Sequence, residues 1–230
     1  MELKIHDIKM EREGWTLFAN GSFGEGIHLV SGDVGSGKSS LALILSGNAR
    51  PENGAIGMEG IGSKAIAFQH PEYHFTGTTV REECGTWGLP AENVIADARL
   101  AGKEDLSPLS LSRGEMKRLV ISCILARPCD LLILDEPFSS LDPFEKELVC
   151  RKISARSSGI TIIFTHEQEI FPAIDFLWEI EDNALVFRGK VPAALERWHH
   201  APPLLKKILA DGRQPKNISP EDLLEAACRT

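Results

Sequence analysis

Short apolar runs recur along the chain and are its clearest pattern. Runs of this kind are typical of strands buried on both faces of a parallel sheet. We therefore expect four of them to form the centre of a parallel sheet covered by helices. These four runs are IHLVS (27–31), KAIAF (64–68), LLIL (131–134) and ITIIF (160–164).

A different pattern opens the chain. The segment LKIHDIKM (3–10) alternates apolar and polar residues with a period of two, which predicts a strand with one wet face. The glycine-punctuated segment AIGMEGI (55–61) is a candidate for the same small antiparallel sheet. The sequence thus predicts an N-terminal antiparallel β subdomain beside the parallel core.

Helical periodicity dominates the stretch from about 75 to 128. Pro90 is placed for the first position of a helix in AENVIADARLAG, and the apolar residues of EMKRLVISCILAR (115–127) fall at helical spacing before Pro128 ends it. We interpret this stretch as a helical lobe inserted into an α/β core. After about 188 the tail shows three short helical stretches separated by prolines. The prediction is one domain over residues 1–230, with a helical extension at about 188–230.

The segment GDVGSGKS (32–39) fits the P-loop pattern G-x-x-x-x-G-K-[ST] between a predicted strand and a predicted helix. Glycines let backbone N–H groups converge on phosphate oxygens, and the helix start adds its positive end. Lys38 is expected to reach the β- and γ-phosphates, and the Ser39 hydroxyl to ligate Mg²⁺. The predicted nucleotide-binding residues are Gly32, Asp33, Val34, Gly35, Ser36, Gly37, Lys38, Ser39 and Ser40.

Two acids end the buried run LLILDEP (131–137). Ligands of parallel sheets bind at the carboxyl ends of the strands, which favours a site here over a simple loop cap. Asp135 is expected to hold Mg²⁺, directly or through water, and Glu136 to polarise the water that attacks the γ-phosphate. The remaining two apolar runs end in Gln69 and in Thr165-His166. We expect Gln69 to touch the metal and the water, and His166 to contact the γ-phosphate or orient Glu136.

The stretch Leu111-Ser112-Arg113-Gly114-Glu115 predicts a capping box at the start of a helix, and capping alone is sufficient reason for these residues. It also provides a second helix start suited to an anion in a chain that already has one. A second phosphate-facing end is explained if it serves the nucleotide of another copy. This predicts a two-fold head-to-tail dimer that closes over two ATP molecules.

In combination and in this order, these motifs resemble the ATP-binding cassette (ABC) ATPases over nearly the whole chain. The resemblance implies the ABC ATPase fold, an ATP sandwich between two cassettes, reopening on hydrolysis, and docking of membrane subunits near Gln69. It also places Asp142, in Ser140-Leu141-Asp142, at the dimer seam. Tyr73, His74 and Phe75 are then candidates for the surface that meets a membrane subunit, with burial in the core as the alternative.

A narrower resemblance is to the ATPases of energy-coupling-factor and cobalt-type importers. It rests on FQHPEYHFTGTTVREE (68–83) and on the tail PPLLKKILADGRQPKNISPEDLLEAA (202–227). It implies uptake of a vitamin or of a transition-metal ion such as cobalt or nickel. Two departures stand out. Arg113 replaces the usual glycine of the family's signature, which is the segment 111–115 here. Its side chain either weakens closure over ATP or adds a charge that helps to hold the phosphate. Trp15 is the candidate for the aromatic residue that stacks on adenine, with a place in the core as the alternative.

The charge and the cysteine content of the chain exclude some classes of binding partner. A formal net charge of −8 argues against a nucleic-acid binder, and five cysteines without a C-x-x-C pair suggest neither a disulfide framework nor a zinc site. The first residues lack the apolar core of a signal peptide, and no apolar run approaches the length of a membrane span. We expect a cytoplasmic protein, peripheral on the inner face of the cell membrane.

Four functions compete at this level. The leading hypothesis is the ATP-hydrolysing motor subunit of an importer, paired as a homodimer or with a related cassette. An ABC-type ATPase of DNA repair would need a long coiled coil, for which the distance from Ser39 to Ser112 leaves no room. A small-molecule P-loop kinase would need neither the signature helix nor His166. An ATP-dependent clamp with weak hydrolysis is disfavoured by Glu136 and His166, although Arg113 keeps it open.

Overall fold

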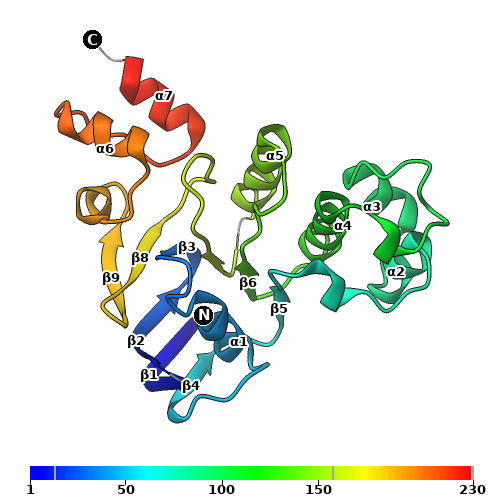
Figure 1. Cartoon of the computed structure of the whole chain (residues 1–230), viewed down its shortest axis with the longest axis horizontal. Helices are drawn as coiled ribbons and strands as arrows, with labels where there is room; N and C mark the ends of the chain where they lie inside the picture. The colour runs from blue at the N-terminus through cyan, green and yellow to red at the C-terminus, as the bar shows by residue number, and fades with distance from the viewer. Residues whose placement is uncertain (13, 157, 229–230) are drawn as a thin grey trace.

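The computed structural model describes residues 1–12, 14–156 and 158–228. Within these residues, the strands form one sheet in the order β4-β1-β2-β9-β8-β3-β7-β6-β5 (Figure 1). The strands are β1 (Glu2–Arg12), β2 (Trp15–Gly24), β3 (Gly26–Ser31), β4 (Asn53–Glu59), β5 (Lys64–Ala67), β6 (Leu131–Asp135), β7 (Ile160–Phe164), β8 (Phe176–Glu181) and β9 (Ala184–Lys190). The α-helices are α1 (Lys38–Ser46), α2 (Val80–Thr86), α3 (Ala91–Asp97), α4 (Arg113–Leu125), α5 (Pro143–Ser154), α6 (Pro203–Ala210) and α7 (Pro220–Cys228). Single 3₁₀ turns are η1 (Pro71–His74), η2 (Pro108–Ser110) and η3 (Ala193–Arg197).

The four apolar runs form the parallel part of this sheet, which confirms that prediction. β5, β6, β7 and β3 pair in parallel, so their carboxyl ends meet at one edge. β8 continues the parallel part beyond β3, and β9 returns antiparallel to β8. β1 pairs antiparallel with both β2 and β4, which confirms the N-terminal antiparallel strands. A single parallel bridge from Phe18 to Ala184 joins the two parts.

One detail of the strand prediction is wrong, because β5 is not buried on both faces. It is the last strand of the sheet and has β6 as its one neighbour, so Lys64 is exposed and Ala65 and Ile66 are half-buried. The other three apolar strands are buried almost throughout. An apolar run indicates a strand, but it does not say whether the strand lies in the middle of the sheet or at its edge, where solvent reaches more of it.

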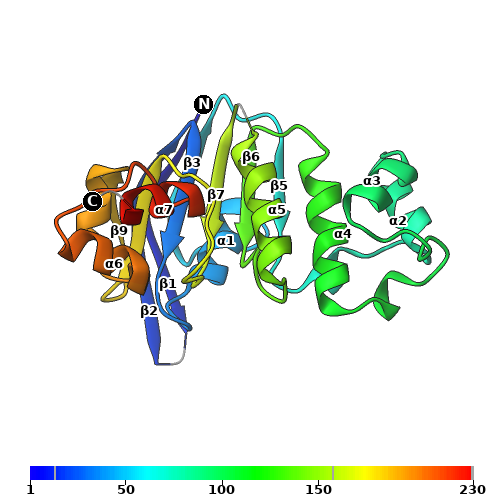
Figure 2. The same ribbon diagram turned by 90° about the horizontal axis from the view of Figure 1, so that it is seen from above.

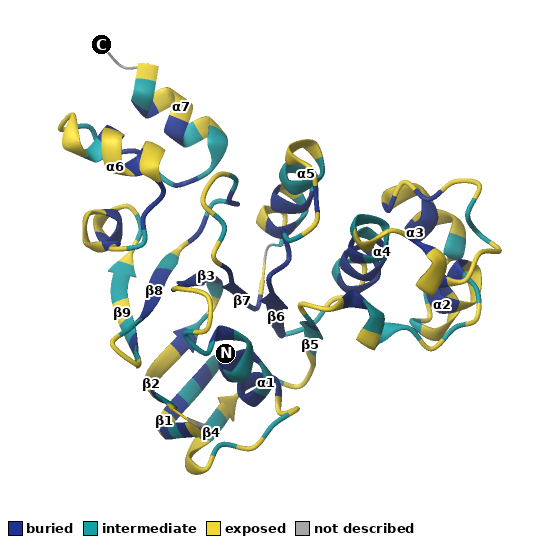
Figure 3. Ribbon diagram, viewed as in Figure 1, coloured by how far each residue is buried: buried dark blue, intermediate teal, exposed yellow. Residues whose placement is uncertain are grey.

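Two apolar clusters cover the two faces of the sheet. One holds residues of α4, α5 and the C-terminal helices, among them Val120, Ile153 and Leu205. The other joins α1 to β1 and β2, among them Leu41, Ile5 and Leu17. Figure 3 shows the buried residues concentrated along the central strands and on the inward sides of these helices.

The helical lobe of α2, α3 and α4 has a small core of its own, which includes Val80, Cys84, Val94 and Leu119. The lobe and the C-terminal helices α6 and α7 lie at opposite ends of the molecule, and α4 is the lobe helix nearest the sheet (Figures 1 and 2). Among the described residues, no helix combines the length and apolarity that crossing a bilayer requires.

The start of α3 differs from the prediction. Pro90 is the N-cap rather than the first helical residue, and the helix ends at Asp97, well before the end of the predicted segment. Arg99 adopts a left-handed conformation with φ of 57°, which turns the chain out of the helix. The start of α4 agrees better, because Ser112 is its N-cap and the capping box with Glu115 is formed.

His28 in β3 predicts an acid-dependent loss of stability. It is 1% exposed, its Nδ1 accepts from Trp178 Nε1 at 3.1 Å, and its Nε2 lies 2.8 Å from the Gly24 carbonyl. Because an indole nitrogen only donates, the ring is satisfied in its neutral form. Burial lowers the pKa of His28 to about 4. The unfolded chain, with a histidine pKa of about 6.5, takes up the proton first, so this stability is present above about pH 6.5 and is lost towards pH 4.

We expect His28→Gln, which offers an acceptor and a donor without titrating, to remove this loss. The wild type should lose up to about 3 kcal/mol more than the variant between pH 7 and pH 4. Urea unfolding followed by tryptophan fluorescence at each pH measures the difference. Exposed His6→Gln is the matched control, and parallel curves for wild type and His28→Gln would contradict the assignment.

Candidate active site

The P-loop connects the carboxyl end of β3 to the start of α1. Gly37 is the N-cap of α1 with φ of 98°, and a Cβ there would lie 2.1 Å from Trp15 Cζ2. Glycine is therefore required at this position for both conformation and space. The loop brings its backbone to the positive end of α1, which is suited to an anion.

Lys38 is buried beneath this loop and is 6% exposed. Its Nζ donates to the carbonyl oxygens of Gly32 at 2.7 Å and Asp33 at 2.8 Å. Burial lowers the pKa of Lys38, and the carboxylates of Glu136, Asp135 and Asp33 oppose that shift. The ammonium is thus held at the loop in a poorly solvated setting, where attraction to a phosphate is stronger than in water.

Ser39, in the first turn of α1, and Asp135, the last residue of β6, bring a hydroxyl and a carboxylate together. Ser39 Oγ donates to Asp135 Oδ1 at 3.1 Å, and burial raises the pKa of Asp135. A hydroxyl and a carboxylate are ligands that Mg²⁺ accepts, so these residues fit the ion. Ser36 Oγ is buried in the same loop with no hydrogen-bond partner among the described residues.

Glu136 is held at both carboxylate oxygens. Its Oε1 lies 2.6 Å from His166 Nδ1 and accepts the His166 backbone N–H at 3.1 Å, while Thr165 Oγ1 donates to Oε2 at 3.0 Å. The Glu136 backbone has φ of 49°, a conformation that is uncommon outside glycine and recurs at functional sites. The carboxylate is therefore fixed by its surroundings rather than free to rotate.

A cavity of 410 Å³ lies among these groups, although Asp135 is not part of its lining. It is lined by Trp15, Val34, Gly35, Gly37, Lys38, Ser39, Ser40, Gln69, Glu136 and His166. The structure thus brings Gln69 and His166 to the P-loop, as the sequence predicts. Of the predicted nucleotide-binding residues, Gly32, Asp33 and Ser36 do not line the cavity. Asp33 is exposed, and His200 Nε2 lies 3.5 Å from its Oδ1.

The signature segment lies at an accessible helix start. Ser112 and Arg113 are exposed, whereas Leu111 is buried. Gly114 faces the Ser140 carbonyl so closely that a Cβ would approach its oxygen to 2.7 Å. Glycine is therefore required at position 114 by a contact within the chain. The neighbouring position, Arg113, tolerates a side chain. Asp142 is exposed and caps α5 through a capping box with Glu145.

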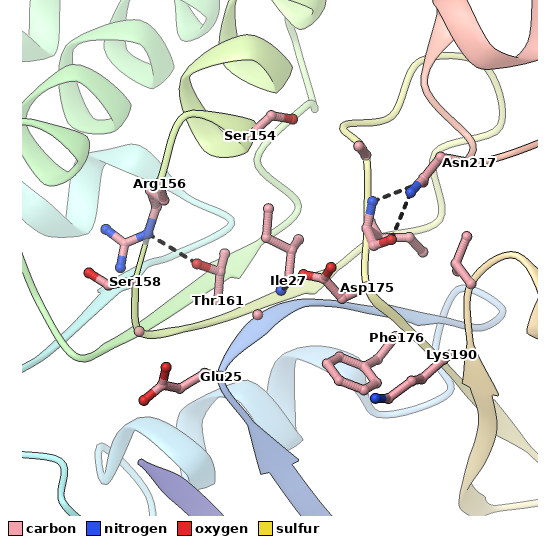
Figure 4. Close-up of a pocket in the computed structure, with 15 residues that line it drawn as sticks. Glu25, Ile27, Ser154, Arg156, Ser158, Thr161, Asp175, Phe176, Lys190 and Asn217 are labelled. Carbon is pink, nitrogen blue, oxygen red and sulfur yellow. Dashed lines mark hydrogen bonds between the residues drawn. The ribbon is translucent and has the colours of Figure 1, made fainter.

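A larger cavity of 610 Å³ lies at the opposite, amino-terminal ends of β3, β7 and β8 (Figure 4). Several of its polar side chains form hydrogen bonds within the chain. Arg156 Nε donates to Thr161 Oγ1 at 3.1 Å, Asp175 accepts the Ile27 N–H, and Asn217 bonds to the Ile174 backbone. This cavity is larger than the one at the P-loop, but the convergent reactive groups are at the P-loop.

Two residues of the site are not predicted by the sequence patterns. In the sequence, Thr165 is recognised only as the residue that follows the apolar run 160–164, and no hydrogen-bond partner is predicted for it. Lys117 has no predicted role, although it lies among the buried residues Val120, Ile121 and Ile124 at helical spacing. A charged residue on an otherwise apolar helix face is the signal that points to it.

The P-loop, the acidic strand end and the histidine at one sheet edge define a P-loop ATPase. Residues 22–139 match the family described as ABC transporter. The chain is 33% identical to the energy-coupling factor transporter ATP-binding protein EcfA1 of Thermotoga maritima, over 86% of this chain and 85% of that protein. It is 29% identical to EcfA1 of Fusobacterium nucleatum, over 96% of this chain and 97% of that protein.

A solved dimeric ATP-binding cassette in a post-hydrolysis state with ADP and Pi has the same fold, with a TM-score of 0.68 and 16% identity. That likeness covers 82% of this chain and 98% of that chain. The chain belongs to the ABC transporter family, as an ATP-binding and ATP-hydrolysing subunit.

Proposed function

We propose that this chain is the motor subunit of an energy-coupling-factor importer for a vitamin or a transition-metal ion. The observation that carries the proposal is the gathering of Lys38, Gln69, Glu136 and His166 around one cavity of 410 Å³. The importer type is supported by the likeness to the two EcfA1 proteins over most of the chain. The paired Glu136 and His166 favour hydrolysis over a clamp that only binds ATP.

In the proposed mechanism, Glu136 accepts a proton from a water molecule as its oxygen attacks the γ-phosphorus of ATP. The bond from the γ-phosphorus to the bridging oxygen breaks, and ADP and phosphate form. Lys38 and the P-loop N–H groups hold the phosphates. His166 keeps the Glu136 carboxylate in position, and Gln69 touches the attacking water. Ser39, Gln69 and Asp135 are the residues that would hold Mg²⁺, which neutralises phosphate charge when bound.

The partner in catalysis is proposed to be a second cassette, identical or related. Its support is the exposed, capped helix start at Ser112, which is accessible to another molecule, and the exposed Asp142 at the proposed seam. Leu111, Arg113, Gly114 and Glu115 complete the surface that would face the neighbour's ATP. A two-fold arrangement completes both sites at once.

Membrane subunits are proposed to dock beside Gln69, which would place the chain at the inner face of the cell membrane. Of the three candidate contact residues, Tyr73 is 73% exposed. His74 is turned inward, where its Nε2 accepts the Phe68 N–H at 3.0 Å, and Phe75 is half-buried between the lobe and the core. Tyr73 is therefore the residue best placed for a membrane partner.

The test is purification of the tagged full-length chain from detergent-solubilised membranes. We expect it to carry along an integral scaffold and a small membrane substrate-binder, and the complex to hydrolyse ATP. Tyr73→Ala should reduce the recovered membrane subunits without changing ATP binding. Recovery of the chain from the soluble fraction alone, with no membrane partner, would contradict the importer assignment.

Arg113 offers a separate prediction about turnover. It is exposed at the first position of α4, where its guanidinium is available to a phosphate of the neighbouring molecule. We expect Arg113→Gly to leave the Kd for ATP within about twofold and to lower kcat by about fivefold or more in the assembled complex. Arg113→Lys, which keeps the charge, is the control. Unchanged steady-state hydrolysis would remove any special role for Arg113.

A further inference from the structure

Lys117 is a charged side chain in the interior of the molecule. It lies on α4, the helix that begins at Ser112, and it is 2% exposed. An ammonium left unpaired in the interior is costly, so a buried lysine needs a set of acceptors. Its aliphatic stem alone does not explain why lysine rather than methionine stands at this position.

The acceptors are three backbone carbonyls from two other segments. Lys117 Nζ lies 2.8 Å from the Gln69 oxygen, 3.2 Å from the Glu136 oxygen and 3.4 Å from the Phe68 oxygen. These carbonyls follow the carboxyl ends of β5 and β6. The Lys117 ammonium therefore links α4 to the backbone that follows β5 and to the backbone that follows β6.

The contact to Glu136 falls on a backbone that needs support. Glu136 has φ of 49°, and its carbonyl oxygen accepts from Ser139 Oγ at 2.9 Å as well as from Lys117. Residues in this conformation persist when their surroundings fix them. The side chain of Glu136 is oriented by Thr165 and His166, and Lys117 holds the other side of the same residue.

Charge is consistent with this geometry. Burial lowers the pKa of Lys117 to about 8, against the attraction of the carboxylates of Asp135, Glu136 and Glu72. Three carbonyl oxygens hold the Lys117 amine in place, and among the described residues it forms no direct salt bridge with the nearby acids.

We propose that Lys117 is a positioning residue that locks Glu136 and Gln69 to the helix whose start faces the neighbouring cassette. Ser112 is about 7–8 Å from Lys117 along the helix axis, so a shift of the helix start moves the ammonium with it. The ATP bound to one cassette then sets the position of α4 in the other cassette. Through Lys117, that position controls hydrolysis in the cassette that contains this α4. This inference rests on the proposed role of Glu136 as the base.

The experiment compares Lys117→Met, Lys117→Gln and Lys152→Met in the assembled complex. Methionine keeps the stem without a donor, and glutamine keeps N–H donors on a shorter side chain. Lys152 is the control, because it also ties the lobe to α5, through Asp97 at 2.6 Å, but does not touch the site. The measurements are kcat, KM for ATP, melting temperature and hydrogen exchange of peptides spanning 66–76 and 136–142.

For Lys117→Met we expect kcat to fall by about 10-fold or more, with KM for ATP within about twofold, because the P-loop is untouched. Exchange should rise in the two peptides and not along α4. Lys117→Gln should recover part of the kcat, and Lys152→Met should stay within about twofold of wild type.

Two results would overturn the proposal. One is a Lys117→Met enzyme with wild-type kcat. The other is equal losses in both Lys117 variants together with a lower melting temperature and faster exchange throughout α4, which would mean that the residue only fills space. Glu136→Gln separates the two proposals. If Glu136→Gln is inactive while Lys117→Met is normal, the Lys117 proposal alone fails, whereas an active Glu136→Gln removes the proposed site.

Discussion

Glu136→Gln is expected to lower ATP hydrolysis by about 10²–10⁴-fold while ATP binding is retained. Glutamine preserves the shape of the side chain and can still bond to Thr165 and His166, but it cannot take a proton from water. The P-loop contacts that hold the phosphates do not involve the Glu136 carboxylate. Steady-state phosphate release and calorimetric titration with ATP measure the two quantities separately.

The same substitution should trap a dimer. If ATP closes two cassettes and hydrolysis reopens them, loss of hydrolysis leaves the closed form populated. We expect light scattering coupled to gel filtration to show twice the monomer mass with ATP and Mg²⁺, and monomer with ADP. Glu147→Gln, on the outer part of α5, is the control and should hydrolyse ATP like wild type.

Two outcomes would count against this account. Hydrolysis near the wild-type rate in Glu136→Gln would remove Glu136 as the base. A variant that binds ATP but stays monomeric at high protein concentration would exclude the homodimer. Pairing with a related cassette would then be favoured, and mixing the two chains would test it.

The sequence predicted the site better than its surroundings. Four apolar runs located the parallel strands because short, continuous apolar runs between polar segments are typical of strands in the middle of a sheet. Once the strands were known, parallel pairing placed their carboxyl ends at one edge. This is why Gln69, Glu136 and His166 could be assigned to the P-loop cavity although they are far apart in sequence.

What the sequence could not give depends on neighbours. β5 has the same apolar pattern as its three companions, yet it is an edge strand because the chain supplies no further partner for it among the described residues. Trp15 packs on Gly37 and lines the cavity, which periodicity in the N-terminal segment does not reveal. Whether it stacks on adenine stays a prediction. The role of Lys117 also depends on tertiary structure, because three carbonyls that are distant in sequence converge on its ammonium.

The site also shows why its buried charges are tolerated. Lys38, Lys117, Asp135 and Glu136 are all nearly inaccessible, and each is offset by another member of the group or by backbone. Burial lowers the pKa of Lys38 and raises that of Asp135, so both ionised forms are poorly solvated in the free chain. A triphosphate with its counter-ion supplies the charges that these groups lack. Ligand binding should therefore stabilise the protein substantially.

Lys38→Ala is expected to weaken ATP binding by at least about 100-fold, because removing one member of a buried charge pair costs several kcal/mol. Without ATP, the substitution should change the free energy of unfolding little. Among the described residues, Lys38 Nζ bonds only to the carbonyls of Gly32 and Asp33, and it is poorly solvated. ATP at about 1,000 times the wild-type Kd should stabilise wild type by about 4 kcal/mol. A Kd weakened 100-fold leaves the same ATP at about 10 times the Kd of Lys38→Ala, so that variant should gain no more than about 1.4 kcal/mol. Calorimetric titration and thermal melts with and without ATP measure both effects.

Lys38→Met, which keeps the aliphatic stem, separates the charge from packing and should behave like the alanine variant. Lys152→Ala serves as the control for loss of a lysine elsewhere, and its ATP affinity should match wild type. If Lys38→Ala and Lys38→Met both fold and bind ATP with near wild-type affinity, the phosphates are not held where the P-loop places them. The proposed roles of Gln69, Glu136 and His166 would then fail with it, because each depends on a γ-phosphate lying in that one cavity.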